Sequence, residues 1–251
     1  MSEGYESQEY ALLGEIDGQE LDGLVFCAKA YQLFEAVRNG PDGVTRLRML
    51  RGPLVGRLVE EVLPMCRYIQ EHYRAGRYLS VKWLSGSQSF DAMLTQRGAL
   101  VDNLEIPPQA HVEVTSAMHA NEYLMREALE QQGWVYGLNG LKRVVVDGVK
   151  TVESHAVAET IDGQIREFAD ILVKAIQKKT TKVPSYPQFS TLVVRCLLNT
   201  LYAAAEWNAL MDLIKNRVTF GPFLEIYVYD EVFHHSQLFK RSWIGDDAIA
   251  L

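Results

Sequence analysis

The chain lacks the patterns that mark membrane, secreted and mononucleotide-binding proteins. Its longest uncharged stretches, such as 183–194, are shorter than the ~18 residues that indicate a membrane span. The acidic N-terminus has neither the basic region nor the apolar core of a secretory signal. The chain contains no Gly-Lys pair and no Gly-x-Gly, so P-loop and dinucleotide fingerprints are absent. We therefore expect a cytoplasmic protein without a membrane segment.

Cysteine is scarce, and neither cysteine nor histidine shows a metal-ligand pattern. The three cysteines, Cys27, Cys66 and Cys196, are widely spaced without a Cys-x-x-Cys pair. This usage predicts buried thiols in a reducing compartment, and neither a zinc site nor a disulfide framework. The segment Glu231 to His235 holds a single Glu-x-x-His, half of a di-iron pattern. No His-Glu-x-x-His occurs, so we expect structural roles for the scattered histidines His111, His119 and His155.

Basic residues are missing from the first 22 positions, and this absence explains the net charge of -7. Of the 32 acidic residues seven lie in 1–22, so the rest of the chain holds 25 acids, equal to its 25 Lys plus Arg. Bases instead gather in 38–82 and 171–205. Such clusters favour either a track for a phosphate backbone or a solvated helix face. We expect 1–22 to be an acidic leader in the form of a disordered solvated tail; the alternative is a segment that lies over the basic 38–82 region and limits nucleic-acid binding.

What is present is the composition of an ordinary globular protein: 251 residues, 48% apolar and 23% charged. Apolar spacing predicts helices over 21–38, 53–74 with a kink at Pro64, 119–132, 155–179 and 197–215. Alternation predicts strands at 79–84, 90–94, 110–115, 191–194 and 224–229, with a hairpin within 134–152. A helix between the last two strands favours their parallel pairing.

Two short apolar strands each carry one acid. Asp91 lies in the run 90–94, and Glu113 lies in 111–115, where His111 and Thr115 share its face because strand side chains alternate. Neighbouring strands of this kind would bring the two carboxylates together. Paired carboxylates hold a hard cation such as Mg²⁺ together with waters and a phosphate oxygen.

This order of elements resembles the PD-(D/E)XK, or restriction-endonuclease-like, nuclease superfamily. The resemblance covers about 55–230 and rests on 89–91, 112–115 and the helix at 161–179 with its following strand. It implies an α/β or α+β fold with a restriction-endonuclease-like mixed sheet flanked by helices. The expected organisation is a leader at 1–22, a helical N-terminal extension at 23–52, a core at 53–235 with an insertion at 119–152, and a C-terminal tail at 236–251.

The resemblance also implies the site. Asp91 and Glu113 match the two metal-binding carboxylates, and the carbonyl of Val114 is the expected third ligand. Magnesium or manganese would then support phosphodiester hydrolysis in DNA, in a defence or restriction setting, with a protein partner or self-association left open. A glutamate of the first core helix assists in the family, which here is Glu60 or Glu61. Gln164 with Phe168 resembles a Gln-x-x-x-Tyr element but lacks its hydroxyl.

The family lysine is replaced by Thr115, which supplies no positive charge. A lysine from elsewhere must then contribute, and the nearby sources are Lys82, Lys178 and Lys179. At ~100° per residue, Lys179 falls on the apolar stripe of its helix whereas Lys174 and Lys178 point away. Lys179 is therefore a candidate catalytic residue, with a snorkelling role as its structural alternative.

Two other functions compete with the nuclease hypothesis. Loss of the family lysine is compatible with a catalytically inactive nuclease-fold module that serves binding or assembly. The spacing of Arg67 and His72 also resembles the Arg-x4-His signature of HEPN ribonucleases, which cleave RNA without metal. Those folds are wholly helical, and the predicted strands count against this reading.

Overall fold

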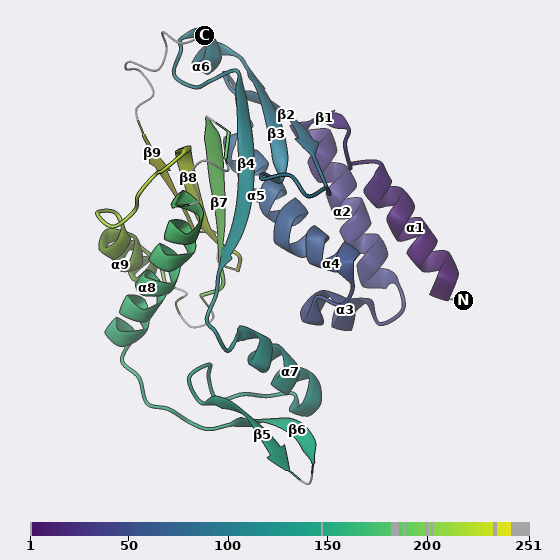
Figure 1. The fold of residues 1–251 in the computed structure, drawn as a ribbon, viewed down its shortest axis with the longest axis vertical. Helices are drawn as coiled ribbons and strands as arrows, with labels where there is room; N and C mark the ends of the chain where they lie inside the picture. Colours follow the sequence, from purple (N-terminus) through teal and green to yellow (C-terminus); the bar gives the residue numbers. More distant parts are fainter. Residues whose placement is uncertain are drawn as a thin grey trace.

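The computed structural model describes residues 2–146, 148–181, 186–187, 189–198, 201, 203–232 and 235–241. A mixed, mostly antiparallel seven-stranded sheet lies at its centre with helices on both faces, and a separate two-stranded hairpin projects from it (Figure 1). This arrangement belongs to the α+β class. Among the described residues, none of the helices combines the length and apolar character needed to cross a bilayer.

The sheet has the strand order β1-β2-β3-β4-β7-β8-β9. β4 pairs with β7 and β7 with β8 in parallel, whereas the four other pairings are antiparallel. The predicted parallel pairing of the strands at 191–194 and 224–229 is thus confirmed. The strands are β1 Glu20–Asp22, β2 Tyr78–Trp83, β3 Ala92–Arg97, β4 Gln109–Ala117, β7 Ser190–Cys196, β8 Phe223–Asp230 and β9 Ser236–Lys240.

Two layers of helices cover the sheet, and alternate strand residues divide between them. One face, with Val81, Leu94 and Val112, packs against the N-terminal helices. The other face, with Leu192 and Val194, packs against the later helices on the opposite side of the sheet (Figure 1). The first layer holds α1 Ser2–Gly14, α2 Gly23–Asn39, α3 Gly43–Met49, α4 Pro53–Arg57 and α5 Leu63–His72, and the second holds α8 Ile161–Thr180 and α9 Ala204–Ile214.

The predicted kink at Pro64 is a change of helix type. Pro64 has no N–H to donate to the carbonyl four residues earlier, so the preceding turn widens. The turn η1, Leu58–Val62, is a π-helix in which the N–H of Leu63 bonds the carbonyl of Leu58. Glu61 lies in this widened turn.

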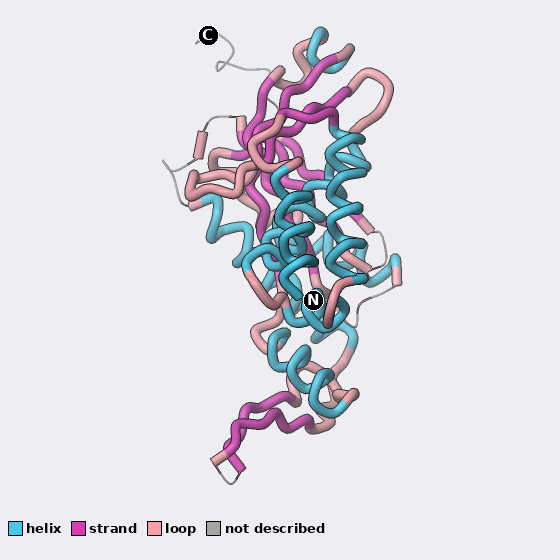
Figure 2. Tube along the Cα trace, turned by 90° about the vertical axis from the view of Figure 1, so that its right-hand side faces the viewer, coloured by secondary structure: helices cyan, strands magenta, loops and turns pink. Residues whose placement is uncertain are grey.

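The insertion forms a small unit of its own between β4 and α8. Helix α7, Glu122–Gln132, ends at Gly133, whose positive φ of 78° suits a residue without a Cβ. Strands β5 Leu141–Val146 and β6 Val149–Ser154 form the predicted hairpin, and Leu141 and Val152 pack on α7. The hairpin points away from the main sheet (Figure 2).

The structure corrects several boundaries. The acidic leader is not a disordered segment: residues 2–14 form α1, and Glu9, 1% exposed, makes two hydrogen bonds at 2.8 and 2.7 Å to the Arg46 guanidinium. This pair does connect the leader to the 38–82 region, as a fixed packing contact. Residues 236–240, assigned to the tail, form strand β9, and 242–251 lie outside the described residues.

The long helix also begins later than its apolar pattern predicted. Thr160 caps the helix by accepting from the N–H of Gly163, so 155–159 precede it, and Val157 is exposed. Helix α9 is likewise shorter than 197–215; positions 199, 200 and 202 of that prediction fall outside the described residues. A polar cap overrides apolar periodicity because it satisfies otherwise unpaired N–H groups.

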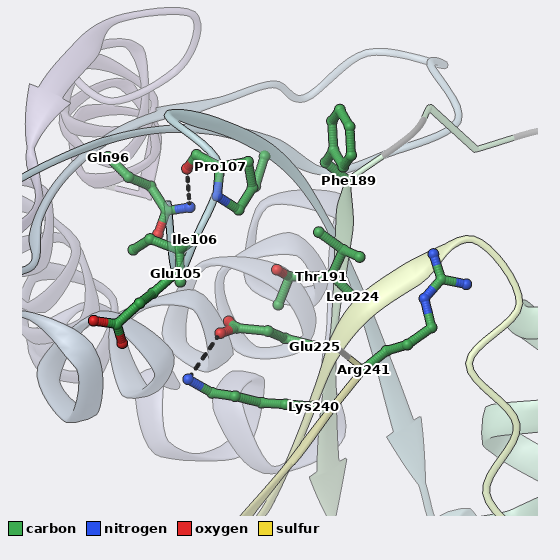
Figure 3. A pocket seen from close by; sticks show the side chains of 11 residues that line it. Gln96, Glu105, Ile106, Pro107, Phe189, Thr191, Leu224, Glu225, Lys240 and Arg241 are labelled. Atoms are coloured by element: carbon green, nitrogen blue, oxygen red, sulfur yellow. Dashed lines mark hydrogen bonds and ion pairs between the residues drawn. The ribbon is translucent and has the colours of Figure 1, made fainter. Parts of the chain in front are cut away.

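A buried ion pair joins α5, β2 and β8 beneath the sheet. The Arg77 guanidinium, 1% exposed, lies 3.1 Å from the Glu225 carboxylate, which also accepts from the Tyr68 hydroxyl at 2.6 Å. Arg77 donates to Gln96 as well, and Gln96 donates to the carbonyl of Pro107. Figure 3 shows Glu225 between Gln96 and Lys240. Burial favours the neutral carboxyl, but the contacts with Arg77 and Tyr68 outweigh it and lower the pKa of Glu225.

This pair predicts a large cost when one partner is removed. Arg77→Met would leave the Glu225 carboxylate buried without its main partner and should lower the free energy of unfolding by about 3–5 kcal/mol. Urea denaturation at neutral pH measures the change. Arg38→Met, at an exposed arginine of α2, is the control and should cost under about 1 kcal/mol. Similar losses in both variants would contradict this assignment.

Candidate active site

Asp91 and Glu113 converge at the start of β3. Asp91 lies in the bend just before Ala92, one residue outside the strand. Its N–H bonds the Val112 carbonyl at 2.8 Å, and its Oδ2 accepts from the Val114 N–H at 2.7 Å. These contacts are with the residues on either side of Glu113. The local backbone thus holds the two acids together.

The surroundings of the Asp91 carboxyl disfavour its charged form. Burial and the negative charge of Glu113 raise the pKa of Asp91 to about 7, while the Val114 N–H and Lys179 act in the opposite direction. A group in this state protonates near neutral pH and is stabilised as a carboxylate by added positive charge.

Lys179 is the lysine that the fold brings to the acids. Its ammonium group forms an ion pair with Oε1 of Glu113, and the two side chains are 18% and 10% exposed. The stripe assigned to α8 explains this position, since Ile165, Phe168 and Ile176 are buried while Lys174 and Lys178 are exposed.

The other candidate residues, Lys82, Thr115 and Val114, have different contacts from Lys179. Lys82 lies opposite Met93 and Glu20 in the sheet and makes no ion pair with any described residue. Thr115 is half-buried on the face of Glu113, and its hydroxyl bonds no described side chain. The N–H of Val114 donates to Asp91, whereas the carbonyl of Val114 remains a predicted metal ligand.

The structure distinguishes Glu61 from Glu60 as the neighbour of the acid pair. Burial raises the pKa of Glu61, the negative charges of Glu60 and Glu113 add to the rise, and Trp83 and Arg57 oppose it. Glu61 also contributes to the raised pKa of Asp91. The Trp83 indole N–H favours the charged form of Glu61, although it makes no regular hydrogen bond with a described residue. Glu61 reaches this charged surrounding from the π-helical turn.

Tyr186 is a further neighbour that sequence reasoning missed. Burial and the proximity of Glu113 hold the pKa of the Tyr186 hydroxyl above its ordinary range. Its ring packs against Phe223, with centroids 5.2 Å apart. Nothing in the pattern around Tyr186 marks it, because it lies between two secondary-structure elements.

The other residues named from the sequence contact side chains other than the acid pair. His119 contacts Glu167 at 3.3 Å and accepts from the Asn121 N–H, which ties the insertion to α8. Gln164 lies in the first turn of α8, about 22 Å along the helix from Lys179, so it is not beside the acids. His155 is exposed and pairs with Glu153, while Phe90 packs on His111.

The carboxylate oxygens of Asp91 and Glu113 are ligands of the kind that a hard divalent cation prefers. Among the described residues no group of three or more His, Cys, Asp or Glu side chains is arranged to hold a metal ion. Mg²⁺ nevertheless needs only one or two carboxylates, with water and ligand oxygens completing its shell. Added positive charge would also relieve the repulsion that raises the pKa of Asp91.

No family model, curated protein or solved structure matches this chain.

The raised pKa of Asp91 predicts a pH-dependent stability without metal. The folded carboxyl binds its proton more tightly than the unfolded one, so wild-type stability should fall as pH rises from about 4 to about 7. Asp91→Asn removes this loss. In EDTA, its unfolding free energy relative to wild type should increase by about 1–3 kcal/mol between pH 4 and pH 8.

Urea titrations at each pH measure this difference, and Asp102→Asn, at an exposed aspartate of the short helix α6, Ala99–Asp102, is the matched control. Parallel pH profiles for Asp91→Asn and wild type would show that Asp91 ionises normally.

Proposed function

We propose that this protein is a metal-dependent nuclease with a restriction-endonuclease-like core, hydrolysing phosphodiester bonds, preferably in DNA. The observation that carries the proposal is the convergence of Asp91, Glu113 and Lys179 from the β3 bend, β4 and the end of α8. Two acids from neighbouring chain segments and one lysine are the side chains that the family resemblance requires. Here the lysine comes from a helix, in place of Thr115.

Each residue of the site would have its own role in phosphodiester hydrolysis. Asp91 and Glu113, with the carbonyl of Val114, would hold Mg²⁺ or Mn²⁺. Bound there, the metal supplies Lewis-acid activation of the phosphate and a hydroxide near neutral pH. Lys179 donates hydrogen bonds and positive charge toward the phosphate oxygens, where negative charge develops. Glu61, which interacts electrostatically with Glu113, would orient the attacking water.

The surroundings support a polyanionic substrate. Lys82 and Arg97 lie on the face of β2 and β3 that alternates with the core residues Val81 and Leu94. Lys178 is exposed beside Lys179. Positive side chains on both sides of the acids would contact the flanking phosphates. A defence or restriction setting follows from the family resemblance.

The seven-stranded sheet counts against the HEPN alternative, whose folds are wholly helical. The ring of His72 is stacked on Tyr68, with centroids 4.3 Å apart, and it is 5% exposed. The inactive-module alternative loses its main argument because Lys179 provides the charge that Thr115 lacks.

The test separates metal binding from cleavage. Asp91→Asn and Glu113→Gln should each lower Mg²⁺- or Mn²⁺-dependent cleavage by ~10²–10⁴-fold and weaken Mn²⁺ binding in calorimetry. Lys179→Met should lower cleavage by a similar factor while Mn²⁺ binding is retained, since a competing cation has been removed.

Lys174→Met, at an exposed lysine of α8 that points away from the acids, is the control and should cleave within about threefold of wild type. Single-stranded and duplex DNA and RNA should be compared as substrates. Absence of cleavage for every substrate, together with unchanged Mn²⁺ binding in Asp91→Asn, would favour the inactive nuclease-fold module.

A further inference from the structure

A second cleft lies on the other face of the sheet, between the end of α5 and the β8–β9 edge. It measures about 280 Å³ and is lined by Glu71, His72, Arg74, Tyr227, Ser236, Gln237 and Leu238. Tyr227 belongs to the core beneath the N-terminal helices, whereas Glu113 pairs with α8 on the opposite side. The cleft is therefore separate from the acid pair.

Tyr227 places a buried hydroxyl at the wall of the cleft. The residue is 1% exposed, and its hydroxyl makes no regular hydrogen bond with any described residue. Its ring packs edge-on against both Tyr68 and His72. Phenylalanine would fill this space without the cost of an unpaired buried polar atom. The Tyr227 hydroxyl lines the cleft near the side chains of Ser236 and Arg67, which the phosphate of a ligand would join as a hydrogen-bond partner.

His72 presents a hydrogen-bond acceptor in the same place. Its Nδ1 lies 2.8 Å from the Tyr68 carbonyl, which can only accept, so Nδ1 carries the proton. Burial, followed by the positive charge of Arg77, lowers the pKa of His72 to about 4, so the ring is neutral at neutral pH. Its Nε2 therefore carries a lone pair, and it bonds no described residue.

The rim of the cleft adds positive charge and a hydroxyl. Arg74 is exposed and makes no ion pair with a described residue. Ser236 begins the edge strand β9, opposite Tyr229. Donors from Arg74, Ser236 and Tyr227 match a phosphate group. Nε2 of His72 and the carboxylate of Glu71 match the hydroxyl groups of a sugar.

The size of the cleft limits the ligand. Pockets for drug-sized molecules usually measure about 300–1,000 Å³, so this cleft holds a molecule at or below that range. We propose that the cleft binds a small phosphorylated sugar, such as a ribose phosphate or mononucleotide, through Arg74, Ser236, Tyr227 and the acceptor of His72.

The test is calorimetric binding to the full chain in EDTA, which prevents metal-dependent cleavage from contributing. Adenosine 5′-monophosphate and ribose 5-phosphate should both bind, and adenosine and inorganic phosphate should each bind at least about tenfold more weakly. Tyr227→Phe, Ser236→Ala and Arg74→Ala should each weaken adenosine 5′-monophosphate by about tenfold. Circular dichroism confirms that each variant is folded.

Arg38→Ala, at an exposed arginine away from the cleft, and Asp91→Asn, at the acid pair, should bind as wild type does. Binding of neither phosphorylated probe at millimolar concentration would overturn the proposal. So would Arg74→Ala and Ser236→Ala both binding adenosine 5′-monophosphate as tightly as wild type, or inorganic phosphate binding as tightly as the sugar phosphates. None of these outcomes depends on whether the protein cleaves nucleic acid.

Discussion

The backbone contacts of Asp91 on either side of Glu113 are the constraint on which the candidate site depends. The β3–β4 ladder pairs Ala92 with Val112, and at its end the Asp91 side chain accepts a hydrogen bond from the N–H of Val114. A one-residue shift of β3 along β4 would direct this carboxylate to the other face of the sheet, because successive side chains alternate between faces. The resulting crowding of negative charge contributes to the raised pKa of Asp91.

The other side chains of the site reach it from the helical layers. Lys179 comes from the last turn of α8 and Glu61 from the π-helical turn before Pro64, so both helical layers of the sheet contribute to one site. The ion pair between Lys179 and Glu113 partly balances the acid pair in the absence of metal. Because α8 also packs on the sheet through Ile176 and Leu172, the lysine position is coupled to the core.

The opposite face of the sheet is organised around the buried Arg77–Glu225 pair. This pair joins the N-terminal helices to the strands near the β9 edge. Burial and the charge of Arg77 lower the pKa of the neighbouring His72, and Glu225 acts in the opposite direction. One sheet thus supports a charged acid site on one face and a polar cleft on the other. The two sites use different residues, so they can be altered independently.

The sequence by itself determined the main helices and strands between residues 21 and 229, the parallel pairing of the later strands, the two acids and the inward stripe of α8 that carries Lys179. These features follow from local periodicity and residue chemistry, which are written along the chain. Only the tertiary structure decided the helical state of the leader, strand β9, the choice of Glu61, the place of Tyr186 and the pairing of Lys179 with Glu113. Each of these depends on burial or on contacts between residues far apart in sequence, whose energies a local pattern does not contain.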